Sequence, residues 1–168
     1  VAENSENPIR KIPYQTPSYS VENGITLLDT PEGPMPIEVF GAHNLSNLAG
    51  AKWICQNMGV DEADFYEAIA TFKGASKRLE KIAESNDKVA YKDFAHSPSK
   101  VAATTKAVKA QYPNRKLVAC LELHTYSSLN AEFLKEYQGA LDAADVAVVF
   151  YSPDAVKIKR LEEVTYDQ

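Results

Sequence analysis

The second half of the chain alternates short apolar runs with helical patterns, and this alternation constrains the fold more than any other feature. Apolar runs at 89–91, 117–121 and 146–150 are typical of buried strands. Helical spacing of apolar residues follows at 98–111 and again at 133–141. Strands joined by helices of this length are normally parallel, with right-handed crossovers. The pattern predicts an α/β domain with a mostly parallel sheet flanked by helices.

In such a sheet every strand-to-helix loop lies at the same edge, just outside the carboxyl ends of the strands, where open α/β sheets bind ligands. The three loops at 92–97, 122–128 and 151–154 therefore form one candidate cleft. A histidine in a loop is often merely solvated, and that alternative stays open for each histidine here. Four residues of these loops are assigned to the cleft as candidates: Asp93, His96, Glu122 and His124.

The first half has a different pattern. Residues 1–20 are polar and contain prolines, which predicts an extended lead-in. Two apolar runs at 25–29 and 36–40 flank a turn-rich Pro-Glu-Gly-Pro spacer, so they are expected to pair as a hairpin. Helical spacing then predicts two helices in series, at 44–58 and 61–74.

Composition excludes several classes of protein. Apolar residues make up 45% and charged residues 24%, which is typical of a soluble globular protein. The net charge is -5 and the basic residues are scattered, so no nucleic-acid partner is expected. No apolar run reaches roughly 18 residues and the start lacks a signal core, which predicts a cytoplasmic protein without a membrane partner. Cys55 and Cys120 lie in apolar segments, where a cysteine usually acts as a small buried hydrophobe.

Asn44 and Asn47 lie three residues apart at an expected helix start, with His43 just outside, so the two amides can face the same way. Amides there can recognise a flat heterocycle through paired donors and acceptors, while the imidazole packs on its face. Capping of the helix by Asn44 explains the same spacing, and spacing alone favours capping.

The segment Gly-Ala-His-Asn-Leu-Ser-Asn at 41–47 resembles the signature of the Mur ligases that begins G-x-H-N-x-x-N. In that family the motif closes the central ATP-binding domain, and the resemblance assigns contacts with adenine and ribose to His43, Asn44 and Asn47. Phe-Lys-Gly-Ala-Ser-Lys-Arg-Leu-Glu at 72–80 is similar to the family's F-x-G-x-x-x-R-x-E segment, which makes Arg78 a nucleotide-contacting residue. Without these neighbours, an exposed cation at a strand start would explain Arg78 equally well.

Tyr-Lys-Asp-Phe-Ala-His-Ser-Pro at 91–98 resembles the D-D-[YF]-[GA]-H-H-P loop of Mur ligases. The resemblance implies that Asp93 holds the nucleotide or its metal and that His96 lies near the incoming amine. It also implies catalytic roles for both residues. Lys92 replaces the first aspartate and Ser97 the second histidine. Ser97 matches an amino-substrate position, but serine before proline is also a standard helix N-cap pair.

Leu-Glu-Leu-His-Thr-Tyr-Ser at 121–127 is similar to the family's F-[EQ]-P-H-x-Y-[ST] segment, which puts His124 and Tyr126 on the amino-substrate side. No two of the three histidines have zinc-binding spacing. No phosphate loop of the form G-x-x-x-x-G-K-[ST] is present, and Mur ligases carry theirs earlier in the central domain. The resemblance therefore implies the tail of a central domain at 1–74 and a truncated Rossmann-like carboxyl-terminal domain at 75–168, inactive alone.

The family implies an ADP-forming amide ligase of peptidoglycan metabolism, dependent on ATP and Mg²⁺, that acts on UDP-N-acetylmuramate through an acyl phosphate. The Phe94-Ala95 pair is closer to the recycling ligases, which add the tripeptide L-Ala-γ-D-Glu-meso-diaminopimelate. His124 with Tyr126 is closer to the ligases that add L-alanine. Such enzymes close by domain rotation, for which a hinge at 74–77 is predicted.

A non-catalytic module that binds a nucleotide or peptide stays as the alternative from another class. A nicotinamide-dependent Rossmann enzyme is not supported, because no G-x-G-x-x-G follows the strand at 89–91.

Overall fold

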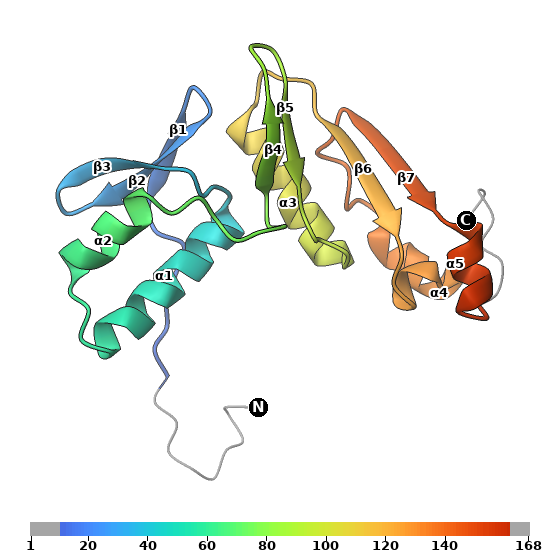
Figure 1. The fold of residues 1–168 in the computed structure, drawn as a ribbon, viewed down its shortest axis with the longest axis horizontal. Helices are drawn as coiled ribbons and strands as arrows, with labels where there is room; N and C mark the ends of the chain where they lie inside the picture. The colour runs from blue at the N-terminus through green and yellow to red at the C-terminus, as the bar shows by residue number, and fades with distance from the viewer. Residues whose placement is uncertain (1–10, 162–168) are drawn as a thin grey trace, which may run out of the picture.

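In the computed structural model, which describes residues 11–161, three small sheets follow one another along the chain with helices packed against them (Figure 1). The first sheet is antiparallel and consists of β1 (Tyr19–Glu22), β2 (Ile25–Thr30) and β3 (Gly33–Ile37). Two helices follow it, α1 (Ala42–Asn57) and α2 (Glu62–Ala70).

The predicted hairpin is confirmed, but its outer parts differ from the prediction. The second strand begins at Gly33, not at Pro36, and includes two prolines, which it tolerates because β3 is an edge strand. β1 begins at Tyr19, inside the expected lead-in, and pairs with β2 across a turn at Asn23 and Gly24. Both turn residues have positive φ, 51° and 79°, as a two-residue hairpin turn requires. That Asn-Gly pair is the sequence signal for β1.

The two helices cover the first sheet and close a small core. Buried Leu28 and Ile37 from the sheet pack against Leu45 from α1 and Phe65 from α2. Asp61 caps α2 as predicted, because its carboxylate accepts a hydrogen bond from the backbone N–H of residue 64 at 2.8 Å. The helix ends at Ala70 and not at position 74, because the chain turns at residue 71.

The second half contains β4 (Glu80–Glu84), β5 (Val89–Lys92), β6 (Val118–Leu123) and β7 (Val146–Tyr151), with α3 (Pro98–Gln111) between β5 and β6. The α/β class is confirmed, and β6 pairs with β7 in parallel as predicted. The prediction of a parallel sheet that contains all three apolar strands is wrong in one respect. β5 pairs in an antiparallel hairpin with β4, an exposed polar strand that the apolar pattern did not reveal.

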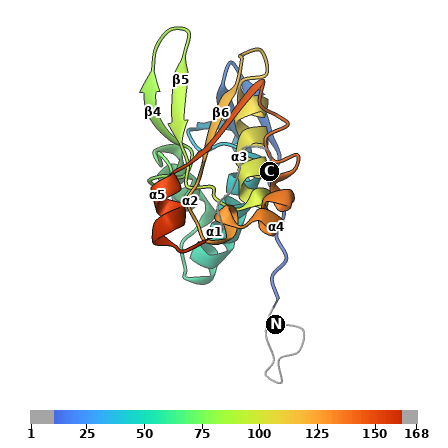
Figure 2. The ribbon, with the colours of Figure 1, turned by 90° about the vertical axis from the view of Figure 1, so that its right-hand side faces the viewer.

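Among the described strands β5 has no hydrogen-bonded partner on its β6 side, and a cavity of about 360 Å³ lies between them. Side chains of both strands and of α3 line this cavity. The β4–β5 hairpin stands clear of β6 in both views (Figure 1 and Figure 2).

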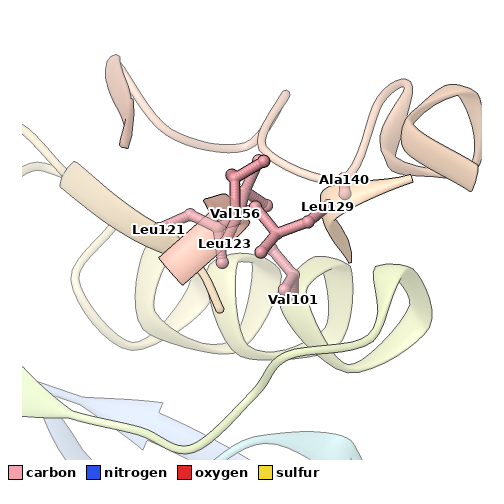
Figure 3. Close-up of a cluster of buried hydrophobic side chains, with 6 residues drawn as sticks. All are labelled: Val101, Leu121, Leu123, Leu129, Ala140 and Val156. Atoms are coloured by element: carbon pink, nitrogen blue, oxygen red, sulfur yellow. The ribbon is translucent and has the colours of Figure 1, made fainter. Parts of the chain in front are cut away.

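A second core lies under β6 (Figure 3). It is formed by six buried residues, Val101, Leu121, Leu123, Leu129, Ala140 and Val156, the last from α5 (Pro153–Ile158). The helix expected at 133–141 is instead a series of short turns: η2 (Ser127–Leu129), α4 (Ala131–Leu134) and η3 (Lys135–Tyr137). Gly139, with φ of 77°, breaks the helical path.

A third buried cluster joins the two halves of the chain. Phe40, which lies between β3 and α1, packs against Leu79 and against Ala107 of α3. At the end of α3, the Gln111 side-chain amide donates to the Gly24 carbonyl at 2.7 Å. α3 therefore contacts both the hairpin turn of the first sheet and the core under β6.

One face of the β6–β7 sheet is uncovered within residues 11–161. Val118 of β6 and Val148 and Phe150 of β7 point to this face and are 44% to 55% exposed. The expectation of a buried cysteine holds in part for Cys55, which packs half-buried on the first core, and is wrong for Cys120, which lies on the uncovered face of β6. None of the helices in this part of the chain is long and apolar enough to cross a membrane.

Candidate functional site

The first predicted site is a cavity of about 300 Å³ between α1 and the linker that follows α2. Asn44 and Asn47, from the start of α1, and Arg78, from the linker, belong to its lining. Leu48 and Phe72 add apolar surface. A flat ring would find an apolar wall to pack on and amide groups at its edge. Two separate sequence motifs therefore meet at one cavity.

The capping explanation for Asn44 is wrong, because the N-cap of α1 is Gly41, with φ of 86°. Asn44 lies inside the first turn, and its side-chain amide donates to the Phe40 carbonyl at 3.0 Å. That bond fixes the amide plane at the cavity. The Asn47 side chain is exposed. Its amide makes no hydrogen bond with another described residue, so it is available to a ligand.

His43 is half-buried and lies outside the lining of this cavity. Burial lowers the pKa of its imidazole below the ordinary value of 6.5, and the negative charge of Asp93 opposes part of this shift. The structure thus brings His43 of the first motif near Asp93 of the third, beside the cavity of the asparagines.

Asp93 follows β5 directly, and its carboxylate is held by the protein. One oxygen accepts from the Leu79 N–H at 2.7 Å. The other accepts from the Ala95 N–H at 2.7 Å and from the Thr104 hydroxyl at 3.3 Å. These bonds join the linker, the loop and α3 at one side chain.

The second predicted site, at the carboxyl ends of β5 and β6, brings His96 and His124 together. Their ring centroids are 6.2 Å apart, and Phe94 lies 5.0 Å from His96 and 6.1 Å from His124. Each histidine Nδ1 lies near a backbone carbonyl two residues earlier, at 2.8 Å for His96 and 3.3 Å for His124. The Tyr137 hydroxyl donates to the His96 carbonyl. Both rings are therefore oriented by their own loops.

Two residues near the predicted site residues were not themselves predicted as site residues. Phe94 is 59% exposed and lies near both imidazoles, although the sequence used it only to compare this loop with those of Mur ligases. Lys159 places its ammonium 4.2 Å from the centre of the Tyr126 ring, which is itself 63% exposed. Ser97 is the N-cap of α3, as its alternative explanation predicts, although its hydroxyl makes no capping bond.

No group of three or more histidine, cysteine, aspartate or glutamate side chains within 11–161 is arranged to hold a metal ion.

Comparison with known proteins identifies the family. The UDP-N-acetylmuramate–L-alanine ligase of Lactococcus lactis is 34% identical over 115 residues, which cover 67% of this chain and 25% of that enzyme. The enzyme of the same name from Microcystis aeruginosa is 35% identical over 134 residues, 77% of this chain and 28% of that enzyme. This chain belongs to the Mur ligase family. It spans about a quarter of the length of the curated Mur ligases that it matches.

Solved structures show the same fold. A UDP-N-acetylmuramate-alanine ligase from Thermotoga maritima superposes with a TM-score of 0.66 and 21% identity, over 84% of this chain and 32% of that one. A complex described as FPGS-AMPPCP-folate gives a TM-score of 0.56 at 17% identity, over 83% of this chain and 35% of that one. No protein-family model matches the chain.

Proposed function

We propose that this chain supplies the adenosine-binding and amine-positioning part of an ATP-dependent Mur ligase. The observation that carries the proposal is the convergence of Asn44, Asn47 and Arg78 on one cavity, although they come from two motifs on either side of α2. A family signature without function would not require its polar residues to meet around a hollow large enough for a ligand. The predicted boundary near residue 74 would put this cavity between two domains.

In the proposed nucleotide site, Asn44 and Asn47 contact the edge of adenine and Arg78 contacts the sugar or phosphate side. The half-buried, uncharged imidazole of His43 adds a surface near the ribose. The FPGS complex supports this assignment, since that protein of similar fold was obtained with AMPPCP, an ATP analogue. ATP would supply the phosphoryl group that activates a carboxylate as an acyl phosphate.

In the proposed amine site, His96 and His124 flank the position of the incoming amine, and Phe94 with Tyr126 provides an aromatic surface. A neutral imidazole there can accept a proton as the amine attacks the activated carboxylate. Ser97, the N-cap of α3, directly follows His96 in the chain and is assigned to the same site by its place in the motif.

The carboxylate that is activated belongs, in this proposal, to UDP-N-acetylmuramate in the cytoplasm. The curated relatives are named as L-alanine ligases, which favours L-alanine as the amine. The Phe94-Ala95 sequence favours the tripeptide L-Ala-γ-D-Glu-meso-diaminopimelate instead. The 168 residues contain no phosphate loop, so we expect this chain to bind adenosine nucleotides without transferring phosphate by itself.

The nucleotide site is tested by titrating this chain with AMP and measuring the dissociation constant by calorimetry. Asn47→Ala should weaken binding by about tenfold, the effect of one lost hydrogen bond of about 1.4 kcal/mol. Asn57→Ala is the matched control, because Asn57 lies at the far end of the same helix and bonds to the Trp53 carbonyl. Equal affinity in all three proteins would refute the site.

The reaction is tested on the natural full-length gene product by ADP release from MgATP with UDP-N-acetylmuramate. Turnover that depends on L-alanine would establish the alanine-adding enzyme, and turnover that depends on the tripeptide would establish the recycling enzyme. A folded protein that binds AMP but turns over neither amine would support the non-catalytic binding module.

A further inference from the structure

Tyr126, in the proposed amine site, is exposed although the turn that carries it is closed by hydrogen bonds. The Thr125 hydroxyl donates to the buried Ser128 hydroxyl at 2.8 Å, and the Ser128 N–H donates back to the Thr125 hydroxyl at 3.1 Å. The Thr125 N–H donates to the Ser128 hydroxyl at 2.9 Å. These bonds join the residues on both sides of Tyr126. The backbone of Tyr126 is therefore held in place while its ring stays open to solvent.

The end of α5 is anchored on the core under β6. The Leu161 N–H donates to the Val156 carbonyl at 3.2 Å, and the Arg160 N–H donates to the Lys157 carbonyl at 3.0 Å. This pair of bonds forms the Schellman motif that ends many helices, and Arg160, with φ of 54°, occupies its left-handed position. Val156 is buried in the core and Leu161 packs against it. The position of Lys159, the C-cap of α5, is thus set by the core.

This helix end places a positive charge on the Tyr126 ring. The Lys159 ammonium lies 4.2 Å from the ring centre, where the negative charge of the aromatic face attracts it. Of the three cation–ring contacts among residues 11–161, this is the one at the proposed amine site. Lys159 forms no ion pair with an acidic side chain of the described part of the chain. Its charge is therefore free to pair with that of a ligand.

Both candidate amines carry negative charge next to the reacting group. L-Alanine has its carboxylate on the carbon that bears the amine, and the tripeptide carries carboxylates on its glutamyl and diaminopimelyl residues. A carboxylate that leaves water on binding needs a cation or several hydrogen-bond donors. His96 and His124 do not meet this need, because an imidazole that accepts the proton of the amine has to be neutral before the attack.

We infer that Lys159 binds a carboxylate of the amine substrate, and that Tyr126 is the surface on which this part of the substrate lies. An ammonium group has three donors and suits this role, because it can lie on the ring and still donate to a carboxylate. The inference rests on the proposed function, from which it takes the amine site. It makes Lys159 a specificity-determining residue, which selects amines that carry a carboxylate over amines in which that group is neutral.

The first test compares each amine with its carboxamide in the ADP-release assay of the full-length gene product. L-Alanine is paired with L-alaninamide, and the tripeptide with the tripeptide whose carboxylates are amidated. The amide is measured as a competitive inhibitor, so its constant is obtained whether or not it reacts. Lys159→Gln should raise the KM of the acid about tenfold, with kcat within about twofold, and leave the inhibition constant of the amide unchanged. An equal rise in both constants would show a structural role and overturn the inference.

Lys157→Gln is the matched control, because it removes the same charge from the same helix. Lys157 is exposed and lies about 200° around the helix axis from Lys159. The KM of the acid should not change in this variant. A rise as large as that in Lys159→Gln would show a general effect of charge and would overturn the contact between Lys159 and the substrate.

A second measurement separates this inference from the proposed function. If the full-length protein turns over neither amine, the proposed reaction fails, and binding of L-alanine and of the tripeptide to this chain decides the inference. NMR signals of the Tyr126 ring follow the titration. A dissociation constant about tenfold higher in Lys159→Gln would support the contact between Lys159 and a carboxylate. Equal constants, or no binding of either amine to the parent chain, would overturn it.

Discussion

Gly41, which precedes α1, lies against α3 from the other half of the chain. A Cβ at this position would lie 2.6 Å from the Cβ of Ala107, and φ is already 86°. We expect Gly41→Ala to lower the free energy of unfolding by about 1–2 kcal/mol from the left-handed backbone and by about 1–3 kcal/mol more from overpacking. Urea denaturation measures the sum.

Gly59→Ala is the control for that prediction, because φ at Gly59 is 94° and nothing lies within 4 Å of an added Cβ. It should show the backbone cost alone. Equal losses in the two variants would mean that α3 shifts to accommodate the methyl group.

His43 gives a prediction about pH. Its pKa in the folded chain lies below 6.5, because burial disfavours the charged imidazole more than the charge of Asp93 favours it. A lowered histidine pKa contributes stability that is complete above about pH 6.5 and is lost as the pH falls towards the folded value. An NMR titration of the ring proton should therefore have its midpoint below 6.5. A midpoint at or above 6.5 would contradict the lowered pKa of His43.

At this scale the sequence was informative about which residues lie together and less so about how they are held. Asn44, Asn47 and Arg78 meet at one cavity, and His96 meets His124, as the motifs indicate. The contacts of Asp93 with Leu79 and Thr104 depend on a tertiary arrangement that no local pattern encodes. Lys159, at the end of α5, contacts the Tyr126 ring through the tertiary structure, so this contact had no signal in the sequence.

The exposed face of β6 makes the two cysteines differ in reactivity. Cys120 is exposed on this strand, whereas Cys55 packs half-buried on the core between the first sheet and its helices. In native conditions Cys120 should react with iodoacetamide about tenfold or more faster than Cys55, since access limits the buried thiol. Timed alkylation followed by peptide mass spectrometry gives both rates. A Cys120→Ser variant that still shows the fast reaction would disprove the assignment.

Elements with a strong local pattern were predictable, and so were the β2–β3 and β6–β7 pairings, but the β1–β2 and β4–β5 pairings were not. Helical spacing located α1 and α3 within a few residues, and the apolar runs located β6 and β7. Prolines hid the true start of β3, and the Asn23-Gly24 turn was passed over within a polar stretch. The pairing of β5 with β4 could not be predicted, because β4 is polar and exposed along most of its length.

The contact between the two halves includes a buried polar group as well as the Phe40 cluster. Gln111 donates to the Gly24 carbonyl at 2.7 Å and accepts from the Thr26 hydroxyl at 3.1 Å. Gln111→Leu should lower the free energy of unfolding by about 1–3 kcal/mol, because it leaves the buried Thr26 hydroxyl and the part-buried Gly24 carbonyl without this bond. Adding Thr26→Val should restore part of the loss, since one orphaned group is then removed. Urea denaturation of the four proteins checks this, and strictly additive losses would show that the pair does not interact.

α3 connects the hairpin turn of the first sheet with the loop that carries His96. Its 14 residues give a rod about 21 Å long, anchored at the Gln111 end on the hairpin turn and carrying Ser97 and His96 at the other. A tilt of about 5° at the anchored end would displace the far end by about 2 Å, and about 1 Å can cost an enzyme a hundredfold in rate. In the proposed ligase, mutations around Gln111 should therefore change turnover, although Gln111 lies at the end of α3 far from His96.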